Sequence, residues 1–128
     1  MTSHELSDPA SRDALRDPLG VALWWGLPLV AGWSAEVLPI SPLAETLVWA
    51  AALTWMGTGC VVNARRCHRL HCYISAPVLL LGATAVVLAG LGWTPLGPHT
   101  ASDLVNGSLG LALLSCLAEP IWGRYRSR

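Results

Sequence analysis

The chain has 128 residues, the length of one domain, and only 12% of them are charged, about half the ~25% of an ordinary globular protein. Its formal net charge is zero, so nucleic-acid binding lacks the basic surface that it requires and is not expected. The charges crowd into residues 1–17, 65–69 and 124–128. Between them lie apolar stretches of about 20 residues, enough for a helix to cross ~30 Å of hydrocarbon. We therefore expect an all-α integral membrane protein.

In chain order, residues 1–18 form a polar tail with charges of both signs, unlike the basic start of a signal peptide. The first apolar segment is therefore expected to be retained. The apolar pattern predicts four transmembrane helices over about 19–38, 43–62, 76–93 and 103–122, followed by a basic tail over 123–128. Pro77 suits the first turn of the third helix, because that position needs no backbone N–H donor. The predicted fold is a four-transmembrane-helix bundle.

The arginines predict the orientation of these helices. Four spans bring the N-terminal tail, the 63–75 loop and the C-terminal tail to one side of the membrane, and all eight arginines belong to these three segments. By the positive-inside rule, both termini and the loop lie in the cytoplasm. The chain has arginine but no lysine, and tryptophan but no phenylalanine, a bias typical of a high-GC bacterial genome. We expect a multi-pass protein of the bacterial inner membrane.

Ligand-type side chains concentrate between the second and third spans, in the sequence Cys67-His68-x-x-His71-Cys72. Thiolate and imidazole groups bind zinc and copper, and thiolates select soft ions. If the segment is helical, Cys67 with His71 and His68 with Cys72 are i,i+4 pairs on one face. Four ligands on one helix seldom complete a tetrahedron, so further ligands are expected from the same membrane face: Cys60, Cys116 and Glu119. The pattern predicts a site for mercury, copper or zinc.

The other charged groups, and two of the cysteines, have two interpretations each. The loop arginines contact lipid headgroups or hold an anionic ligand: Arg65, Arg66 and Arg69. Four ionisable groups fall at the outer ends of the spans, where they form a cation or proton site or are solvated at the headgroups: Glu36, Glu45, His99 and Asp103. Cys60 and Cys116 serve either as ligands or as small packing residues.

The run Arg66-Cys67-His68-Arg69-Leu70-His71-Cys72-Tyr73, followed by a small residue and a proline, resembles a pattern of small bacterial integral membrane proteins with an Arg-Cys-x-Arg-x-His-Cys-Tyr motif. The resemblance implies a membrane location and carries no activity. Small mercury-resistance membrane proteins are also similar in having cysteines at span ends and in cytoplasmic loops. This chain lacks their adjacent Cys-Cys pair.

Three functions follow from these patterns. The first is binding or transport of a soft metal ion by the cytoplasmic cysteines and histidines. The second is a membrane enzyme with Cys67 or Cys72 as nucleophile and a neighbouring histidine as base, although the chain has no C-x-x-C pair. The third is an accessory subunit whose arginine-rich loop docks a partner. Besides the lipid bilayer, the expected partners are further copies of the chain or a larger membrane complex.

Overall fold

The computed structural model describes residues 13–14, 16–95 and 99–123, and the described residues form helices and short connections without any strand. The basic C-terminal tail and most of the N-terminal tail lie outside the described residues. The helices, in chain order, are α1 (Pro18–Val21), the π-helical turn η3 (Ala22–Gly26), α2 (Leu27–Val37), α3 (Pro42–Cys67), α4 (Leu70–Gly90), α5 (Thr100–Leu117) and α6 (Glu119–Trp122).

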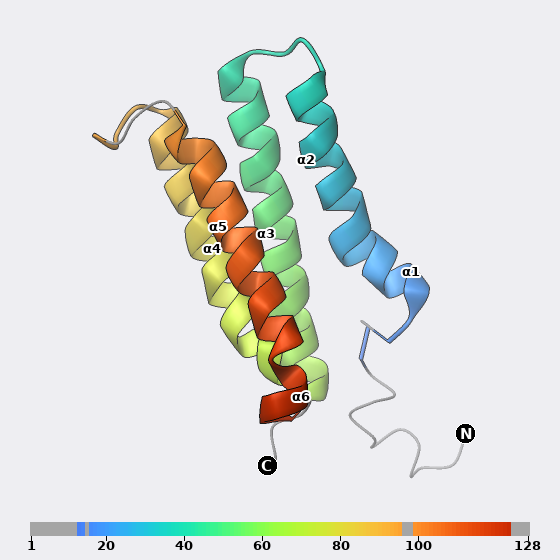
Figure 1. The fold of residues 1–128 in the computed structure, drawn as a ribbon. Coiled ribbons are helices and arrows are strands. Elements are labelled where there is room, and N and C mark those ends of the chain that lie inside the picture. The colour runs from blue at the N-terminus through green and yellow to red at the C-terminus, as the bar shows by residue number, and fades with distance from the viewer. Residues whose placement is uncertain (1–12, 15, 96–98, 124–128) are drawn as a thin grey trace.

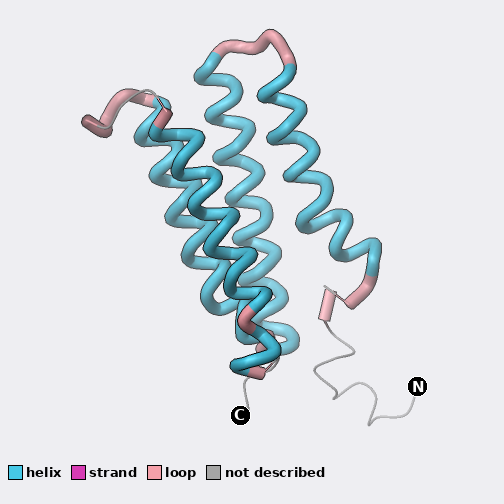
Figure 2. Tube along the Cα trace, viewed as in Figure 1, coloured by secondary structure: helices cyan, strands magenta, loops and turns pink. Residues whose placement is uncertain are grey.

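The helices run up and down, and each packs mainly against its neighbour in sequence (Figures 1 and 2). The α2–α3 and α4–α5 connections lie at one end of the bundle. The α3–α4 turn, α1 and α6 lie at the other end (Figure 1). The first and last described helices therefore share one end of the bundle with the turn that the cysteine- and histidine-rich stretch forms.

Three helices are long and apolar enough to cross a membrane: Pro42–Cys67, Leu70–Gly90 and Thr100–Ile121. Large apolar side chains point outward along them, and Leu81 is 70% exposed. A lipid environment accounts for this exposure, since such a surface in water would be unfavourable. By length and composition, these helices are compatible with a multi-pass membrane protein. The first apolar segment instead consists of the three short pieces α1, η3 and α2.

The prediction of a polar loop over residues 63–75 is wrong. α3 continues to Cys67 and α4 begins at Leu70, so only a two-residue turn separates them. His68 makes this turn with a φ of 55°, the left-handed conformation that ends many helices. Pro77 consequently lies inside α4 and not in its first turn. The polar side chains of this segment have hydrogen-bond partners at the end of the bundle. The two helices can therefore extend past the apolar spans that hydropathy predicted, 43–62 and 76–93.

Close contacts between large and small residues hold the first segment against α3. Gly32 of α2 faces the Trp49 ring, and Gly59 of α3 faces the Trp24 ring; a Cβ on either glycine would lie under 3.0 Å from ring carbons. Trp55 donates a hydrogen bond from Nε1 to the Leu23 carbonyl in the π-helical turn, at 3.1 Å. Trp24 and Trp49 therefore pack between the first segment and α3.

Gly82 marks the closest approach of α4 to α5. A Cβ added there would overlap the Ser108 side chain, lying 2.9 Å from its Cβ. We expect Gly82→Ala to lower the free energy of unfolding by about 1–3 kcal/mol, because an overpacked contact forces side chains or backbone to move. Gly110 on α5 is the matched control, since no atom lies within 4 Å of its added Cβ.

Gly110→Ala is expected to raise stability by up to about 1 kcal/mol, because alanine favours a helix more than glycine does. Denaturant titration of both variants in detergent micelles, followed by circular dichroism, measures the two changes. Equal effects of the two substitutions would contradict the close contact at Gly82.

Candidate functional site: a buried thiol, imidazole and carboxylate cluster

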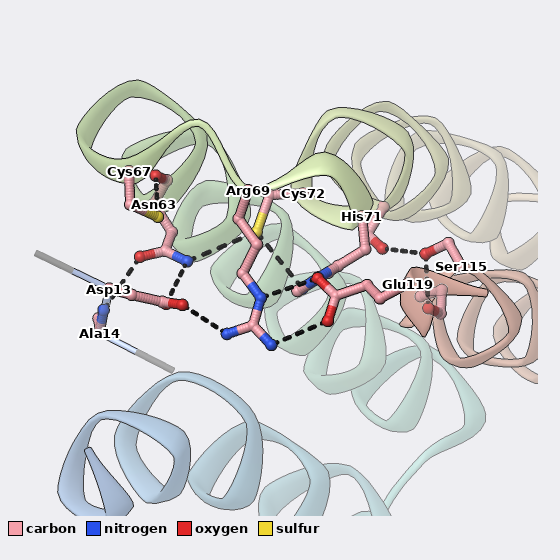
Figure 3. A network of polar contacts seen from close by, with 11 residues as sticks. Asp13, Ala14, Asn63, Cys67, Arg69, His71, Cys72, Ser115 and Glu119 are labelled. Carbon is pink, nitrogen blue, oxygen red and sulfur yellow. Dashed lines mark hydrogen bonds and ion pairs between the residues drawn. The ribbon is translucent and has the colours of Figure 1, made fainter. Parts of the chain in front are cut away.

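A polar cluster occupies the end of the bundle where α3 turns into α4 (Figure 3). It combines the last turns of α3, the α3–α4 turn and the first turn of α4. The start of α6 and Asp13, which precedes α1, complete it. One turn further along, the hydroxyls of Ser75 and Ser115 lie 2.7 Å apart and join α4 to α5. Side chains from every described part of the chain that reaches this end thus meet at one place.

Arg69 links two carboxylates at the centre of the cluster. Its Nε and NH2 donate to the two oxygens of Glu119 at 2.8 and 3.0 Å, and its NH1 donates to Asp13 Oδ2 at 2.6 Å (Figure 3). The Asp13 side chain is fully buried and that of Glu119 is 8% exposed. The hydrogen bonds to Glu119 hold the pKa of Arg69 above its ordinary value, so the guanidinium stays charged.

His71 lies between a carboxylate and a thiol. Its Nδ1 is 2.5 Å from Glu119 Oε1, and its Nε2 is 3.4 Å from Cys72 Sγ. An ionised carboxylate can only accept, so the Nδ1 carries the hydrogen, while the other ring nitrogen, Nε2, faces the sulfur. Both His71 and Cys72 are buried, with exposures of 1% and 0%. The ring is therefore fixed in orientation, with Nδ1 toward the carboxylate and Nε2 toward the sulfur.

Two further thiols adjoin this pair. The Cys60 side chain, from α3, interacts with that of Cys72, and the Cys116 side chain, from α5, interacts with His71. Cys60 is 1% exposed, whereas Cys116 is half-buried. All four cysteines are free thiols. The sequence-based prediction that Cys60, Cys116 and Glu119 lie near His71 and Cys72 agrees with this arrangement.

A cavity of about 220 Å³ opens beside the cluster. Its wall combines three polar groups of the cluster with apolar side chains from the first helical segment and α5: Arg69, His71, Cys116, Val21, Trp25 and Leu113. Cys60 and Cys72 are not part of this wall. The cavity therefore reaches one face of His71 and the Cys116 thiol, while the other two thiols lie behind them.

Asn63 and Asp13 belong to the cluster, but sequence reasoning missed both. Asn63 Nδ2 donates to Asp13 Oδ1 at 2.9 Å and lies 3.6 Å from Cys72 Sγ. Asn63 Oδ1 accepts from the backbone N–H of Ala14 at 3.1 Å. The sequence did contain a signal for Asn63, because this amide directly follows a long apolar run. Asp13 gave no such signal, because it is one of several acids in a polar tail.

Cys67, His68, His71 and Cys72 do not share one helical face, which a continuous helix over this segment would have required. Because the helix breaks at His68, Cys67 and His68 belong to the end of α3 while the other two begin α4. Cys67 donates its thiol hydrogen to the carbonyl of Asn63, 3.1 Å away. His68 Nδ1 lies 2.9 Å from the Tyr73 hydroxyl. Cys67 thus joins the cluster only through the Asn63 backbone, and His68 pairs with Tyr73.

The arginines of the turn divide in the same way. Arg65 and Arg66 are exposed at the end of α3, and their contact with headgroups stays a prediction. Arg69 points inward to carboxylates of its own chain, which the headgroup interpretation did not anticipate. Arg69 differs from Arg65 and Arg66 in its ion pairs with Asp13 and Glu119. Both partners lie far away in the sequence, so no local pattern indicates them.

Four predicted residues lie at the opposite end of the bundle: Glu36, Glu45, His99 and Asp103. Glu36 accepts a hydrogen bond from Trp49 Nε1 at 3.1 Å, a role in joining α2 to α3. Within residues 13–14, 16–95 and 99–123, three or more His, Cys, Asp or Glu side chains nowhere form a group that could hold a metal ion. The outer cation or proton site stays a prediction, and the cluster at His71 offers pairs of ligands.

Comparison of the chain with protein-family models, curated proteins and solved structures gives no match. The function of this membrane protein is therefore inferred from the chemistry of the cluster.

Proposed function

We propose that the chain binds one soft metal ion between the thiols of Cys60 and Cys72, with His71 as a further ligand, in a four-span protein of the bacterial inner membrane. The observation that carries the proposal is the orientation of His71: Nδ1 is held by Glu119, while Nε2 faces Cys72 Sγ at 3.4 Å. Metal-binding histidines almost always donate their second nitrogen to a carboxylate or carbonyl in this way.

The distance supports the same proposal. With metal–sulfur and metal–nitrogen bonds of about 2.3 and 2.0 Å, tetrahedral ligand atoms lie about 3.5 Å apart. The separation of Cys72 Sγ from His71 Nε2 is 3.4 Å, so an ion needs no movement of the backbone to reach both. Cys60 approaches the same thiol from α3. Cys72 and His71 thus form a ligand pair, and Cys60 on α3 adjoins the Cys72 thiol.

The number of available ligands narrows the class of ion. Zinc in structural sites takes four ligands, and no group of even three is assembled among the described residues. Cuprous and mercuric ions accept as few as two or three ligands, and thiolates select such soft ions. A neighbouring pair of buried thiols, Cys60 and Cys72, therefore favours copper(I) or mercury(II) over zinc.

Charge and length support four spans with both termini in the cytoplasm. From Pro18 to Val37, the pieces α1, η3 and α2 follow one another without a break, and about 1.5 Å per residue gives a length of about 30 Å. That length matches the hydrocarbon layer. The described arginines, at positions 16, 65, 66 and 69, belong to the end of the bundle that holds the cluster, which the positive-inside rule assigns to the cytoplasm.

The test is the metal content of the purified full-length protein. The chain is purified in detergent with a reductant, loaded separately with copper(I), mercury(II) and zinc, and freed of excess ion. Elemental mass spectrometry then gives the ions per chain. We expect about one copper(I) or mercury(II) ion in the wild type and almost none in Cys72→Ser, since a hydroxyl is a poor ligand for a soft ion.

Cys67→Ser is the matched control, because Cys67 is equally buried and a serine hydroxyl can still donate to the Asn63 carbonyl. It should retain the wild-type metal content. Size-exclusion profiles check that both variants fold. Undiminished binding by Cys72→Ser, or equal loss in both variants, would reject the proposed ligand set.

A thiol enzyme is the second candidate, and the chain Glu119–His71–Cys72 favours it. A carboxylate that orients an imidazole beside a thiol is the arrangement of an activated nucleophile. Cys72 is 0% exposed, however, and does not line the cavity, so no substrate reaches its sulfur. The burial of Cys72 therefore favours the binding of an ion, which needs only a small volume, over catalysis on a larger substrate.

A further inference from the structure

Access to the proposed metal site is restricted on the side of the cavity. Cys60 and Cys72 are 1% and 0% exposed and are absent from the cavity wall, whereas Cys116 is half-buried and lines it. The Cys116 side chain also interacts with His71, the proposed ligand behind it. An ion that arrives through the cavity meets Cys116 first and the inner thiols afterwards.

We propose that Cys116 is an exchange ligand, which takes a soft ion from a small amino-acid thiol bound in the cavity and passes it to Cys60 and Cys72. This inference rests on the proposed function and names the form in which the ion arrives. In the first step the Cys116 thiol forms a new sulfur–metal bond, the bond from the metal to one carrier thiolate breaks, and the departing thiolate takes the proton that Cys116 gives up. In the second step Cys60 and Cys72 form bonds to the metal while its bonds to Cys116 and to the second carrier thiolate break, and these two thiolates take the protons that Cys60 and Cys72 give up. No oxidation or reduction takes place.

The size of the cavity sets the class of carrier. Its volume of about 220 Å³ is several times the ~30 Å³ of a water molecule. It is smaller than the ~300–1,000 Å³ pockets that enclose drug-sized ligands. A thiol of the size of cysteine suits this space, and a protein carrier does not enter it.

Arg69 explains why the carrier would be an amino-acid thiol. A guanidinium has five N–H donors. Three contacts to described residues engage Nε, NH1 and NH2 with the carboxylates of Glu119 and Asp13. Arg69 also lines the cavity. Its remaining N–H donors suit the carboxylate of the carrier, whose thiol end is then directed toward Cys116.

The experiment measures how fast the reduced, metal-free protein takes mercury(II) from its cysteine complex, using stopped-flow ultraviolet absorption of the thiolate–metal bonds. We expect Cys116→Ser to load at least roughly tenfold more slowly, because exchange depends on access of an attacking thiol. Leu113→Trp, which fills the cavity, should slow loading in the same way. Leu114→Trp is the control, since Leu114 is exposed on the same helix and lies outside the cavity wall.

Wild-type loading rates in Cys116→Ser or Leu113→Trp would overturn the exchange role. So would a lower final metal content in Cys116→Ser, because Cys116 would then be a resident ligand. If the wild type binds no metal, the proposed function fails by itself. Labelling with iodoacetamide then tests the cavity independently: the inference requires Cys116 to react well before Cys60 and Cys72, and an unreactive Cys116 overturns it.

Discussion

Arg69→Gln is expected to lower the free energy of unfolding by about 3–5 kcal/mol, because it leaves two buried carboxylates without their guanidinium. Asp13 is fully buried and Glu119 is 8% exposed, so water replaces the lost partner poorly. Asp13 keeps its hydrogen bond from Asn63 at 2.9 Å, and Glu119 keeps its contact with His71 at 2.5 Å. These neighbours supply hydrogen bonds but no permanent positive charge.

Arg65→Gln is the matched control, because Arg65 lies one turn away and is exposed. It should change stability by no more than about 0.5 kcal/mol. Arg69→Lys should recover only part of the loss, since an ammonium cannot match both oxygens of Glu119 at once. Denaturant titrations of the three variants in one detergent give the comparison. A loss below about 1 kcal/mol in Arg69→Gln would mean that the carboxylates are solvated.

The same residue shows how far the sequence alone predicts this protein. Hydropathy predicted an all-helical membrane protein with helices near the observed ones, because the length of an apolar run and the need to satisfy the backbone are local properties. Arg69 differs from Arg65 and Arg66 only in its partners, which come from residues 13 and 119. Contacts across such distances in sequence leave no local pattern.

The ligand stretch shows a second limit. Its composition drew attention to His71 and Cys72, and membrane topology added Cys60, Cys116 and Glu119, which the structure places beside them. The grouping with Cys67 failed because one residue, His68, adopts a φ of 55° and ends α3. Left-handed conformations favour glycine or asparagine, so a histidine at this position gave no sign of a helix end. One dihedral angle thus separates two thiols that lie five residues apart in sequence.

Glu119→Gln is expected to weaken binding of copper(I) or mercury(II) about 10–100-fold, the usual effect of removing the carboxylate behind a metal-binding histidine. The carboxylate orients the ring through Nδ1 and makes Nε2 a stronger ligand for a metal. A neutral amide orients the ring less firmly and raises the basicity of Nε2 less. Competition with a chelator of known affinity measures the change in Kd. The variant also loses an ion pair with Arg69, so a loss of affinity could arise from a loosened bundle end.

Asp13→Asn separates these two causes. It removes the other carboxylate from Arg69, whose NH1 lies 2.6 Å from Asp13, but it does not touch His71. If ring orientation determines affinity, Asp13→Asn lowers stability and leaves Kd near the wild-type value, while Glu119→Gln changes both. Equal losses of affinity in the two variants would show that the ion pairs act on the site only through the rigidity of the bundle end. The Glu119–His71 contact would then have no special role toward a metal.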